Sequence, residues 1–523
     1  MAETRRKPSD QPLPALRVER VEPALSPSRI GGRLRAEGYD VRPLHGTSYL
    51  DLDCGAGANL IAQAAAFPEA DFTGTPSGGA DSIRTFALQA KVQNVETRSA
   101  DLRNFDADLG RYDFIVANDL FSGAGTAERM ALLVLAKRHL AETGALCVGI
   151  DVYPGWRILE ELRDIFGASL DRSVPLRKQV RAVRAAVWDL TDGIRDGKYP
   201  DRKHQLPELQ RLGRASDAEL FRDLVDPGRR PVSIADFAAM ADAAKLKLVG
   251  DADLLKTNPV LLPEKLRPKT GGSGPPDLAK LCADIDRYAN TRRRMVLLCH
   301  AERPAPEIGF QERLEHICLT STLAQADPSI RETELLKKGK IAFNGPVSYQ
   351  TSDPVEIVAL TLMARHRHFP IQLAQLAAHV DAALRGNAAT RIDRDKIAQA
   401  LFRLCGKLLP TGALIPHMAE TRAARRPGNR PRLAPLALLQ ARQGADRLAS
   451  LTPHDVMVDD VARFILSRFD GTQAVAQIVA DLVQAVADGK FVLPPIAPTP
   501  DARANATVGR VLAHAAASGL LVG

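Results

Sequence analysis

The stretch YLDLDCGAGANLI, residues 49–61, decides the fold expected for this chain. It has the pattern of a strand that ends in a glycine turn, after which a helix begins. A turn of this kind commonly holds a nucleotide-like cofactor, because small residues let the backbone approach a ligand closely. Two positions depart from the pattern: Asp53 stands where a glycine is expected, and Ala58 stands where another would help. The stretch therefore raises the question whether this turn is a working cofactor loop.

Strands and helices alternate on both sides of the turn. Short apolar runs predict five strands, at residues 48–53, 70–75, 95–101, 112–119 and 145–151. Helical periodicity predicts the intervening helices, at residues 59–66, 80–93 and 126–144. The fourth strand, YDFIVAND, is largely apolar and contains the run FIVA, as expected for a strand covered on both faces. The alternation predicts an α/β fold with a parallel sheet and right-handed crossovers.

Two later segments supply the missing edge of this sheet. Residues 234–253 have the pattern of a helix followed by a strand, and residues 292–302 have the pattern of a further strand. The α/β domain is therefore predicted to be discontinuous, comprising residues 28–166 and 233–302. The helical stretch 167–232 is then an insertion, and residues 266–277, rich in Gly and Pro, form a loop between the last two strands.

The remaining segments lack this alternation. Residues 1–27 are rich in Pro, Arg and Ser and are expected to be disordered. A helical middle domain (310–420) and a helical C-terminal domain (433–523) are predicted from amphipathic patterns. Between them lies a basic stretch that we interpret either as a solvated connector or as a docking site for an acidic partner; its arginines are Arg422, Arg425, Arg426, Arg430 and Arg432.

The composition narrows the functional classes. The chain has 523 residues and a net charge of +8, and only 5% of its residues are aromatic, with no row of aromatics alternating with basic residues. This composition argues against a nucleic-acid-binding function. No apolar run is long enough to span a bilayer, so no membrane partner is expected. The six cysteines form no zinc-binding pattern, so we expect no metal, and they suit a reducing, cytoplasmic location.

Several stretches, in a fixed order, resemble class I S-adenosylmethionine-dependent methyltransferases: LDLDCGAGANLI (50–61), FTGTPS (72–77), SADLRNFD (99–106), YDFIVAND (112–119) and GIDVYPGW (149–156). The pair DFAAMADAAKLKLVGDADL (236–254) and RRRMVLLCHAE (292–302) is similar to the bacterial subgroup that carries a methyltransferase regulatory domain. That subgroup includes rickettsial protein-lysine methyltransferases that act on outer-membrane protein. PRLAPLALLQARQG (431–444) and LSRFDGTQAVAQIVADLV (466–483) resemble its C-terminal part.

This resemblance implies a Rossmann-like methyltransferase domain that binds S-adenosyl-L-methionine, followed by a mainly α-helical C-terminal half. Seven residues are the cofactor-site candidates. They match the family's cofactor site, lie in the glycine turn or stand at the end of the fourth strand: Asp51, Asp53, Gly55, Gly57, Asn59, Asp101 and Asn118. The resemblance also implies a protein lysine acceptor, possibly in a surface or outer-membrane protein, and an insertion that supports a homodimer.

The chemistry of methyl transfer requires an acceptor aligned with the methyl group and, for lysine, an amine in its neutral form. The candidate residues near the acceptor are Asp119, Asp151 and Tyr153. Two of these candidates have a structural alternative: Asp119, like Asn118, is equally suited to a capping or turn role, and the Tyr-Pro-Gly-Trp stretch that contains Tyr153 could simply turn the chain and bury an indole.

The departures from the family pattern leave a second function open. The family's ribose-binding acid should lie near Pro76, and no carboxylate follows until Asp81. Gly123 and its neighbours replace an aromatic and histidine-containing stretch. If Asp53 fills the crevice, the chain is a methyltransferase-like scaffold or regulatory protein-binding module. If Asp81 or Ser77 reaches the ribose position, it is a methyltransferase.

Overall fold

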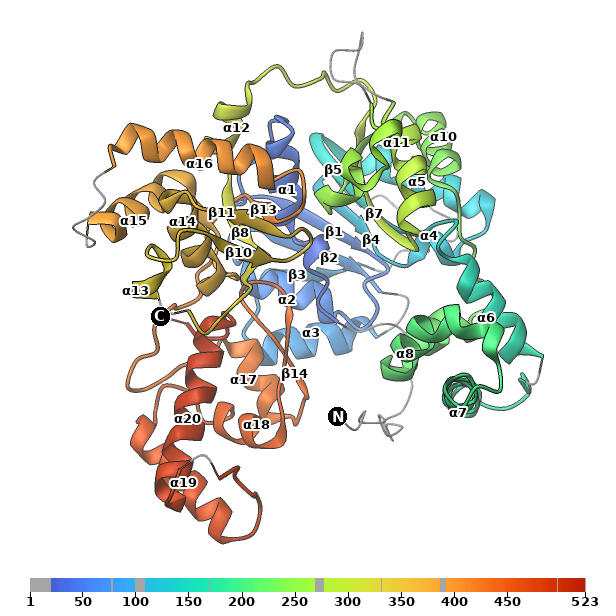
Figure 1. Ribbon diagram of the computed structural model, residues 1–523. Coiled ribbons are helices and arrows are strands. Elements are labelled where there is room, and N and C mark those ends of the chain that lie inside the picture. Colours follow the sequence, from blue (N-terminus) through green and yellow to red (C-terminus); the bar gives the residue numbers. More distant parts are fainter. Residues whose placement is uncertain are drawn as a thin grey trace.

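The structure of the chain, a computed structural model, is shown in Figure 1. It describes residues 20–76, 79–98, 109–168, 170–268, 277–330, 332–385, 392–495 and 497–522. Asp101 and Ser77, which the sequence analysis singled out, lie outside the described residues, as does most of the N-terminal segment expected to be disordered.

A seven-stranded sheet forms the centre of the first domain. Its strand order is β3-β2-β1-β4-β5-β7-β6, and all pairs are parallel except those made by β7, which runs antiparallel to β5 and β6. The strands are β1 (Ser48–Leu52), β2 (Asp71–Thr75), β3 (Val95–Thr97), β4 (Tyr112–Ala117), β5 (Leu140–Asp151), β6 (Leu246–Asp251) and β7 (Arg293–His300). The predicted discontinuous α/β fold is thus confirmed, since β6 and β7 complete the sheet.

Successive residues of the strands face opposite sides, as the two-residue period of a strand requires. Tyr49 and Phe72 pack in the core on one face, whereas Leu50 and Ile115 pack on the other. The first face is covered by α1 (Pro27–Ala36), α2 (Ala58–Ala66) and α3 (Ala80–Gln89). The second face is covered by α5 (Thr126–His139), α10 (Ile234–Ala243) and α11 (Leu278–Ala289).

Three local predictions need correction. Residues 23–25 form a short 3-10 helix, η1 (Pro23–Leu25), and Leu25 is buried in the core, so residues 20–27 are not disordered. The helix α5 ends at His139 rather than at Gly144, because Leu140 already pairs with Tyr112 of β4. The helix α11 lies between β6 and β7 and was not predicted, because the Gly- and Pro-rich residues before it predicted only a loop between the two strands.

The insertion between β5 and β6 is helical and has its own apolar core, which includes Trp156 and Leu209. Figure 1 shows its helices standing to one side of the sheet. Its elements are α6 (Arg157–Gly167), α7 (Leu176–Arg195), η2 (Pro200–Gln205), α8 (Leu206–Arg214), α9 (Asp217–Leu220) and η3 (Phe221–Val225).

The C-terminal half is mainly helical, as predicted, and adds short strands that were not predicted. Its first core contains α12 (Phe310–Glu315), α14 (Pro354–Arg365), α15 (Leu373–Arg385), α16 (Arg394–Leu408), β8 (Cys318–Ser321), β10 (Ile341–Asn344) and β13 (Leu414–His417). The shorter elements there are β9 (Ala324–Gln325), α13 (Glu332–Leu335), β11 (Tyr349–Thr351) and β12 (Ile371–Gln372). Strands of two to four residues are too short for a periodic pattern to reveal.

The last core contains α17 (Pro435–Arg442), β14 (Arg447–Ala449), β15 (Asp455–Met457), α18 (Asp460–Leu466), α19 (Val475–Ala487) and α20 (Pro500–Ala517). The helix α1 joins the sheet to the C-terminal half: a Cβ atom at Gly32 would lie 2.5 Å from the backbone of His417 in β13. Only glycine therefore allows this close packing of α1 on β13.

Candidate functional site

The candidate site lies at the carboxyl edge of the sheet, where parallel strands end. Asp51 lies near the end of β1, Asn118 directly follows β4, and Asp151 ends β5. Because β7 is antiparallel, its first residue, Arg293, pairs with Asp151 at the same edge. In open α/β sheets this edge is the usual place for a ligand.

The glycine turn keeps the backbone conformation of a cofactor loop despite its altered sequence. Asp53 has φ 65°, Gly55 has φ 61° and Gly57 has φ 85°, all in the left-handed region. Aspartate tolerates that region better than most residues, so it replaces a glycine here without changing the turn. The backbone N–H of Asp53 also donates to Thr75 Oγ1 at 3.1 Å, which ties the turn to the end of β2.

The turn packs closely on its surroundings. A Cβ atom at Gly74 in β2 would lie 2.7 Å from Cys54 Sγ, so this glycine allows the turn to lie against the sheet. Gly57 is the N-cap of α2 and makes no side-chain cap hydrogen bond. The N-terminus of α2 therefore opens at the carboxyl edge with only backbone at its tip, which suits an anionic group of a ligand. Ala58 is simply the first residue of this helix and needs no glycine conformation.

Asn59 and the buried Asp51 lie next to this turn and contact each other. Asn59 Nδ2 donates to Asp51 Oδ2 at 3.5 Å, while the backbone N–H of Glu22 donates to Asn59 Oδ1 at 3.1 Å. Gln63 Nε2 also donates to Asn59 Oδ1 at 3.3 Å. Asn59 thus fixes the segment before α1 against the turn. Glu22 was not among the predicted site residues, because residues 1–27 were predicted to be disordered.

The predicted ribose side of the site has no carboxylate at the end of β2. Pro76 occupies the expected position, and Asp81 lies in the first turn of α3 with its side chain 99% exposed and 3.7 Å from Arg84. The structure does not bring Asp81 into contact with the turn residues. Asp101, the predicted adenine-side acid, lies outside the described residues.

An arginine–aspartate cluster lies beside the turn, at the ends of β4, β5 and β7. Arg229 Nε donates to Asp151 Oδ2 at 2.6 Å, and Arg229 Nη2 donates to Asp119 Oδ1 at 2.9 Å. Arg293 Nη1 lies 3.0 Å from Asp119 Oδ1 and 3.3 Å from Asp151 Oδ1. Arg293 Nη2 also donates to Asn118 Oδ1 at 2.8 Å. The structure therefore brings together Asn118, Asp119 and Asp151, and it adds two arginines that sequence reasoning missed.

The charges of this cluster are balanced. Burial raises the pKa of Asp119, but the positive charges of Arg293 and Arg229 outweigh burial and hold it well below its usual range. Burial lowers the pKa of Arg229, but the negative charges of Asp151 and Asp119 raise it by more, so the Arg229 pKa lies above its usual value. Asp119 is thus a carboxylate with little tendency to accept a proton at neutral pH. Its geometry suits orienting its neighbours better than general-base catalysis.

Gly149 in β5 makes the close approach within the cluster possible. A Cβ atom at this position would lie 2.1 Å from the carbonyl oxygen of Asn118 and 2.7 Å from Arg293 Nη2. Neither atom can move freely, because Arg293 also bonds the Asn118 backbone at 2.7 Å. Gly149 therefore fixes the position of Asn118 at the sheet edge.

The Tyr-Pro-Gly-Trp stretch lies between the cluster and the helical insertion. Tyr153 Oη donates to Glu160 Oε1 at 2.5 Å, and burial, together with this bond, raises the Tyr153 pKa to about 12. Trp156 is 3% exposed, and the guanidinium groups of Arg163 and Arg229 lie 5.6 and 5.9 Å from its ring centre. The buried indole agrees with the structural alternative for this stretch, and it couples the insertion to the cluster.

A cavity of about 360 Å³ adjoins the cluster and extends from the sheet edge towards β13. Arg293 lines it together with Met295, and polar side chains from three regions line the rest, namely Glu22, Arg29, Asp253, Lys256 and Thr322. Burial lowers the pKa of Arg29 despite the nearby Glu22 and Asp253. Two opposing effects would act on an amine in this cavity: burial favours its neutral form, whereas the carboxylates of Glu22, Asp251 and Asp253 favour its charged form.

Within the described residues, no group of three or more His, Cys, Asp or Glu side chains is arranged to hold a metal ion. None of the helices in the described part of the chain is both long and apolar enough to cross a bilayer.

The sheet order, with one antiparallel strand inserted next to the last, defines a class I methyltransferase-like fold, as the sequence resemblance predicted. The chain superimposes on PKMT2 from Rickettsia typhi with a TM-score of 0.82 and 17% sequence identity, covering 97% of this chain and 100% of that chain. The structure of the same Rickettsia typhi protein in complex with AdoHcy gives a TM-score of 0.80 at 17% identity, over 96% of this chain and 99% of that chain.

Sequence comparisons agree with this match. Residues 429–520 match the family described as PKMT, C-terminal winged helix domain. The Rickettsia prowazekii (strain Madrid E) protein named "Uncharacterized protein RP789" is 19% identical over 469 residues, which are 87% of this chain and 82% of that protein. The resemblance to rickettsial-type protein methyltransferases is therefore confirmed at the level of the fold, over nearly the whole chain.

Proposed function

We propose that the chain is an S-adenosylmethionine-dependent methyltransferase whose acceptor is a lysine side chain of a protein. The observation that carries this proposal is the glycine turn, which keeps three left-handed residues and leads into the open N-terminus of α2 beside the buried Asp51. Asp53 keeps the left-handed backbone conformation of the glycine it replaces, so the turn retains its shape.

The residues of the turn and of the end of β4 fit the cofactor, whereas Pro76 at the end of β2 supplies no carboxylate for its ribose. Gly55 and Gly57 would let the backbone approach it, Asp51 and Asn59 offer a carboxylate and an amide at the turn, and Asn118 offers an amide at the end of β4. A Cβ atom at Gly57 would lie 3.0 Å from Ile83, so the turn leaves little space for a larger residue. When bound, the cofactor supplies a methyl group on a sulfonium, which is already a strong electrophile. The fold of the Rickettsia typhi protein, whose structure with AdoHcy is known, supports this assignment.

The chain's own contribution is then alignment and desolvation of the acceptor. The cluster around Arg229 and Arg293 holds Asn118 and Asp119 at one wall, and the cavity beside Arg293 provides a route for a side chain. Burial in this cavity favours the neutral, nucleophilic amine, and the carboxylates of Glu22, Asp251 and Asp253 that line it are positioned to bind the incoming ammonium group. The protein acceptor, and its location in a surface or outer-membrane protein, rest on the family resemblance.

The test is transfer of labelled methyl groups from S-adenosylmethionine to bacterial outer-membrane protein, with the modified residue identified by mass spectrometry. We expect label on lysine, and we expect Asp51→Asn to reduce transfer strongly, whereas Asp171→Asn, at an exposed position of the insertion, leaves it unchanged. Unchanged turnover of Tyr153→Phe would remove Tyr153 from the catalytic candidates. Failure to bind cofactor at all would favour the scaffold function, and cofactor binding with label confined to residues other than lysine would overturn the proposed acceptor.

A further inference from the structure

The basic stretch between the last two parts of the chain is not a loose connector. We name residues 421–432 the arginine segment. Its backbone is fixed at both ends: Ala424 N–H donates to Leu521 O at 2.9 Å, and Val475 N–H donates to Asn429 O at 2.9 Å. Two residues after Asn429, Pro431 O accepts a hydrogen bond from Gly471 N–H at 3.0 Å. The backbone of the segment is therefore a preformed part of the surface.

The arginine side chains of this segment are exposed and lack acidic partners. In the part of the chain that the structure describes, no ion pair joins them to a carboxylate; they are Arg422, Arg425, Arg426, Arg430 and Arg432. Arg425 Cζ lies 5.5 Å from the ring centre of Phe369, and burial, together with the charges of Arg425 and Arg365, lowers the pKa of nearby His366. The segment thus carries uncompensated positive charge on a rigid backbone.

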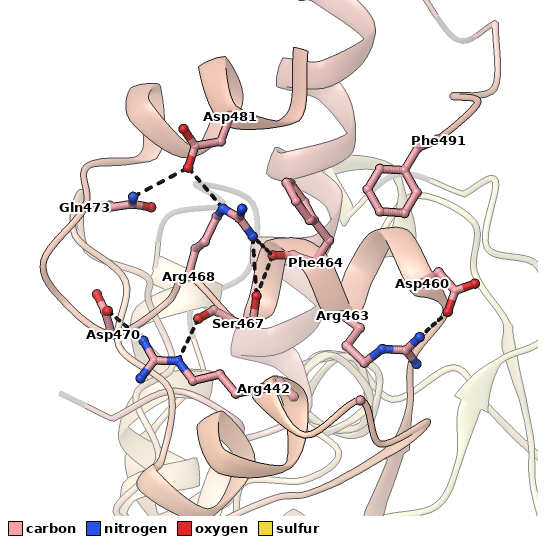
Figure 2. Close-up of a pocket in the computed structure, with 12 residues that line it drawn as sticks. Arg442, Asp460, Arg463, Phe464, Ser467, Arg468, Asp470, Gln473, Asp481 and Phe491 are labelled. Atoms are coloured by element: carbon pink, nitrogen blue, oxygen red, sulfur yellow. Dashed lines mark hydrogen bonds and ion pairs between the residues drawn. The ribbon is translucent and has the colours of Figure 1, made fainter. Parts of the chain in front are cut away.

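A groove in the C-terminal domain begins next to this segment. Arg432 pairs in an isolated β-bridge with Asp470, and Arg430 donates a side-chain hydrogen bond to Thr472 O, so both arginines lie along the turn at residues 470–473. Asp470 and Gln473 of that turn line a groove of about 610 Å³ between α17, α18 and α19 (Figure 2). The arginine segment and the groove therefore form one continuous surface.

Figure 2 shows that the groove carries both signs of charge. Arg442 Nη2 donates to Asp470 Oδ2 at 2.8 Å, and Arg468 Nε donates to Asp481 Oδ2 at 3.0 Å. Arg468 Cζ also lies 3.6 Å from the ring centre of Phe464, so this aromatic face is already covered. The groove's aspartates Asp460, Asp470 and Asp481 are each paired with an arginine, so the groove presents both signs of charge to a bound chain. The surface is therefore suited to a peptide of mixed charge whose acidic part lies on the arginine segment.

We infer that the arginine segment and the adjoining groove bind an acidic segment of a protein, with carboxylates on the arginine segment and the peptide continuing into the groove. Arginine presents a planar set of donors that matches carboxylate geometry. The partner we assign is the methyl-accepting protein, an assignment that rests on the proposed function. Docking far from the sheet edge would then select the acceptor protein independently of the lysine that is modified.

The experiment measures binding of a fluorescent peptide, in which glutamate alternates with serine and leucine, to the full chain at low ionic strength. We expect measurable affinity that falls as salt rises, and about tenfold weaker binding when Arg422, Arg425 and Arg426 are all changed to Glu. Changing the same residues to Gln should give a smaller loss. Unaltered melting temperature shows that the variants fold, as expected for exposed positions.

The matched control changes the exposed cations Lys337, Lys338 and Lys340 to Glu, which alters net charge equally in a cluster elsewhere. An equal loss in this control, or equal binding of a peptide with glutamine in place of glutamate, would overturn the inference. Tighter binding of a duplex or single-stranded oligonucleotide than of the peptide would overturn it too. AdoHcy binding separates the two proposals: a chain that binds AdoHcy but not the peptide loses only the docking surface, whereas peptide binding without methyl transfer leaves the docking surface and removes the proposed function.

Discussion

The glycine turn at residues 53–57 and the arginine–aspartate cluster around Arg229 lie at the same edge of the sheet, but they are held in place in different ways. In the turn, a departure from the family sequence leaves the backbone unchanged, because Asp53 adopts the left-handed conformation of the glycine it replaces. In the cluster, side chains from β4, β5, β7 and the end of the insertion depend on one another through charge. The turn is thus held by local backbone conformation, whereas the cluster is held by ion pairs between residues far apart in the sequence. Mutations in the two regions should therefore change stability and cofactor binding to different degrees.

The largest effect is expected from removing the centre of the cluster. Arg229→Met leaves Asp151, whose side chain is 1% exposed, without its closest cation, and we expect a loss of about 3–5 kcal/mol in the free energy of unfolding. Urea denaturation measures this loss. Arg230→Met is the matched control, because Arg230 is exposed and its side chain donates to the backbone carbonyls of Pro227 and Arg229. Equal stability of the two variants would contradict the role of the cluster.

A smaller effect is expected from crowding the cluster through the backbone. Gly149→Ala places a methyl group against Asn118 O and Arg293 Nη2, so we expect a loss of about 2 kcal/mol and weaker cofactor binding. Gly123→Ala provides the control, since a Cβ atom there meets no atom within 4 Å. Thermal melting with and without AdoHcy distinguishes the two variants. If Gly149→Ala melts with wild-type stability, the strand edge is looser than the structure indicates.

The dependence of stability on pH sharpens the electrostatic part of the comparison. The folded protein holds the Asp119 carboxyl at a pKa below its ordinary value of 3.8, so its stabilisation is present above that value and is lost as pH falls below it. We therefore expect Asp119→Asn to flatten the decrease in unfolding free energy on acidification. Denaturation series at several acidic pH values measure the slope. Identical slopes for wild type and variant would show that Asp119 is not held by the two arginines.

The smallest effect is expected in the turn itself. Asp53→Gly relieves the left-handed strain of a non-glycine residue, and we expect the chain to become about 0.5–1 kcal/mol more stable while the turn is kept. Lys245→Gly is the control, since Lys245 has φ 60° far along the chain, between α10 and β6. Both variants should be stabilised, but only Asp53→Gly should change AdoHcy affinity. A destabilised Asp53→Gly would mean that the Asp53 side chain, rather than its backbone, holds the turn.

Local features of the fold could be predicted from the sequence, whereas the long-range partners in the site could not. The strands at 48–53 and 112–119, the discontinuous sheet and the turn glycines follow from local patterns, because periodicity and left-handed positions depend on neighbouring residues. The predicted Asp119 and Asp151 do meet at one edge. Their arginine partners were not predictable, since Arg229 is 78 residues from Asp151 and Arg293 is 142 residues away. No local pattern distinguishes these two arginines from the many exposed ones.

The central claim is that the altered turn still binds S-adenosylmethionine. Calorimetric titration of the full chain with S-adenosylmethionine and AdoHcy tests it most directly. We predict binding at micromolar strength, weakened about tenfold to a hundredfold by Asp51→Asn and unaffected by Asp71→Asn at the opposite edge of the sheet. The absence of heat and of any thermal shift at millimolar ligand would contradict the account, and the chain would then be a methyltransferase-like scaffold.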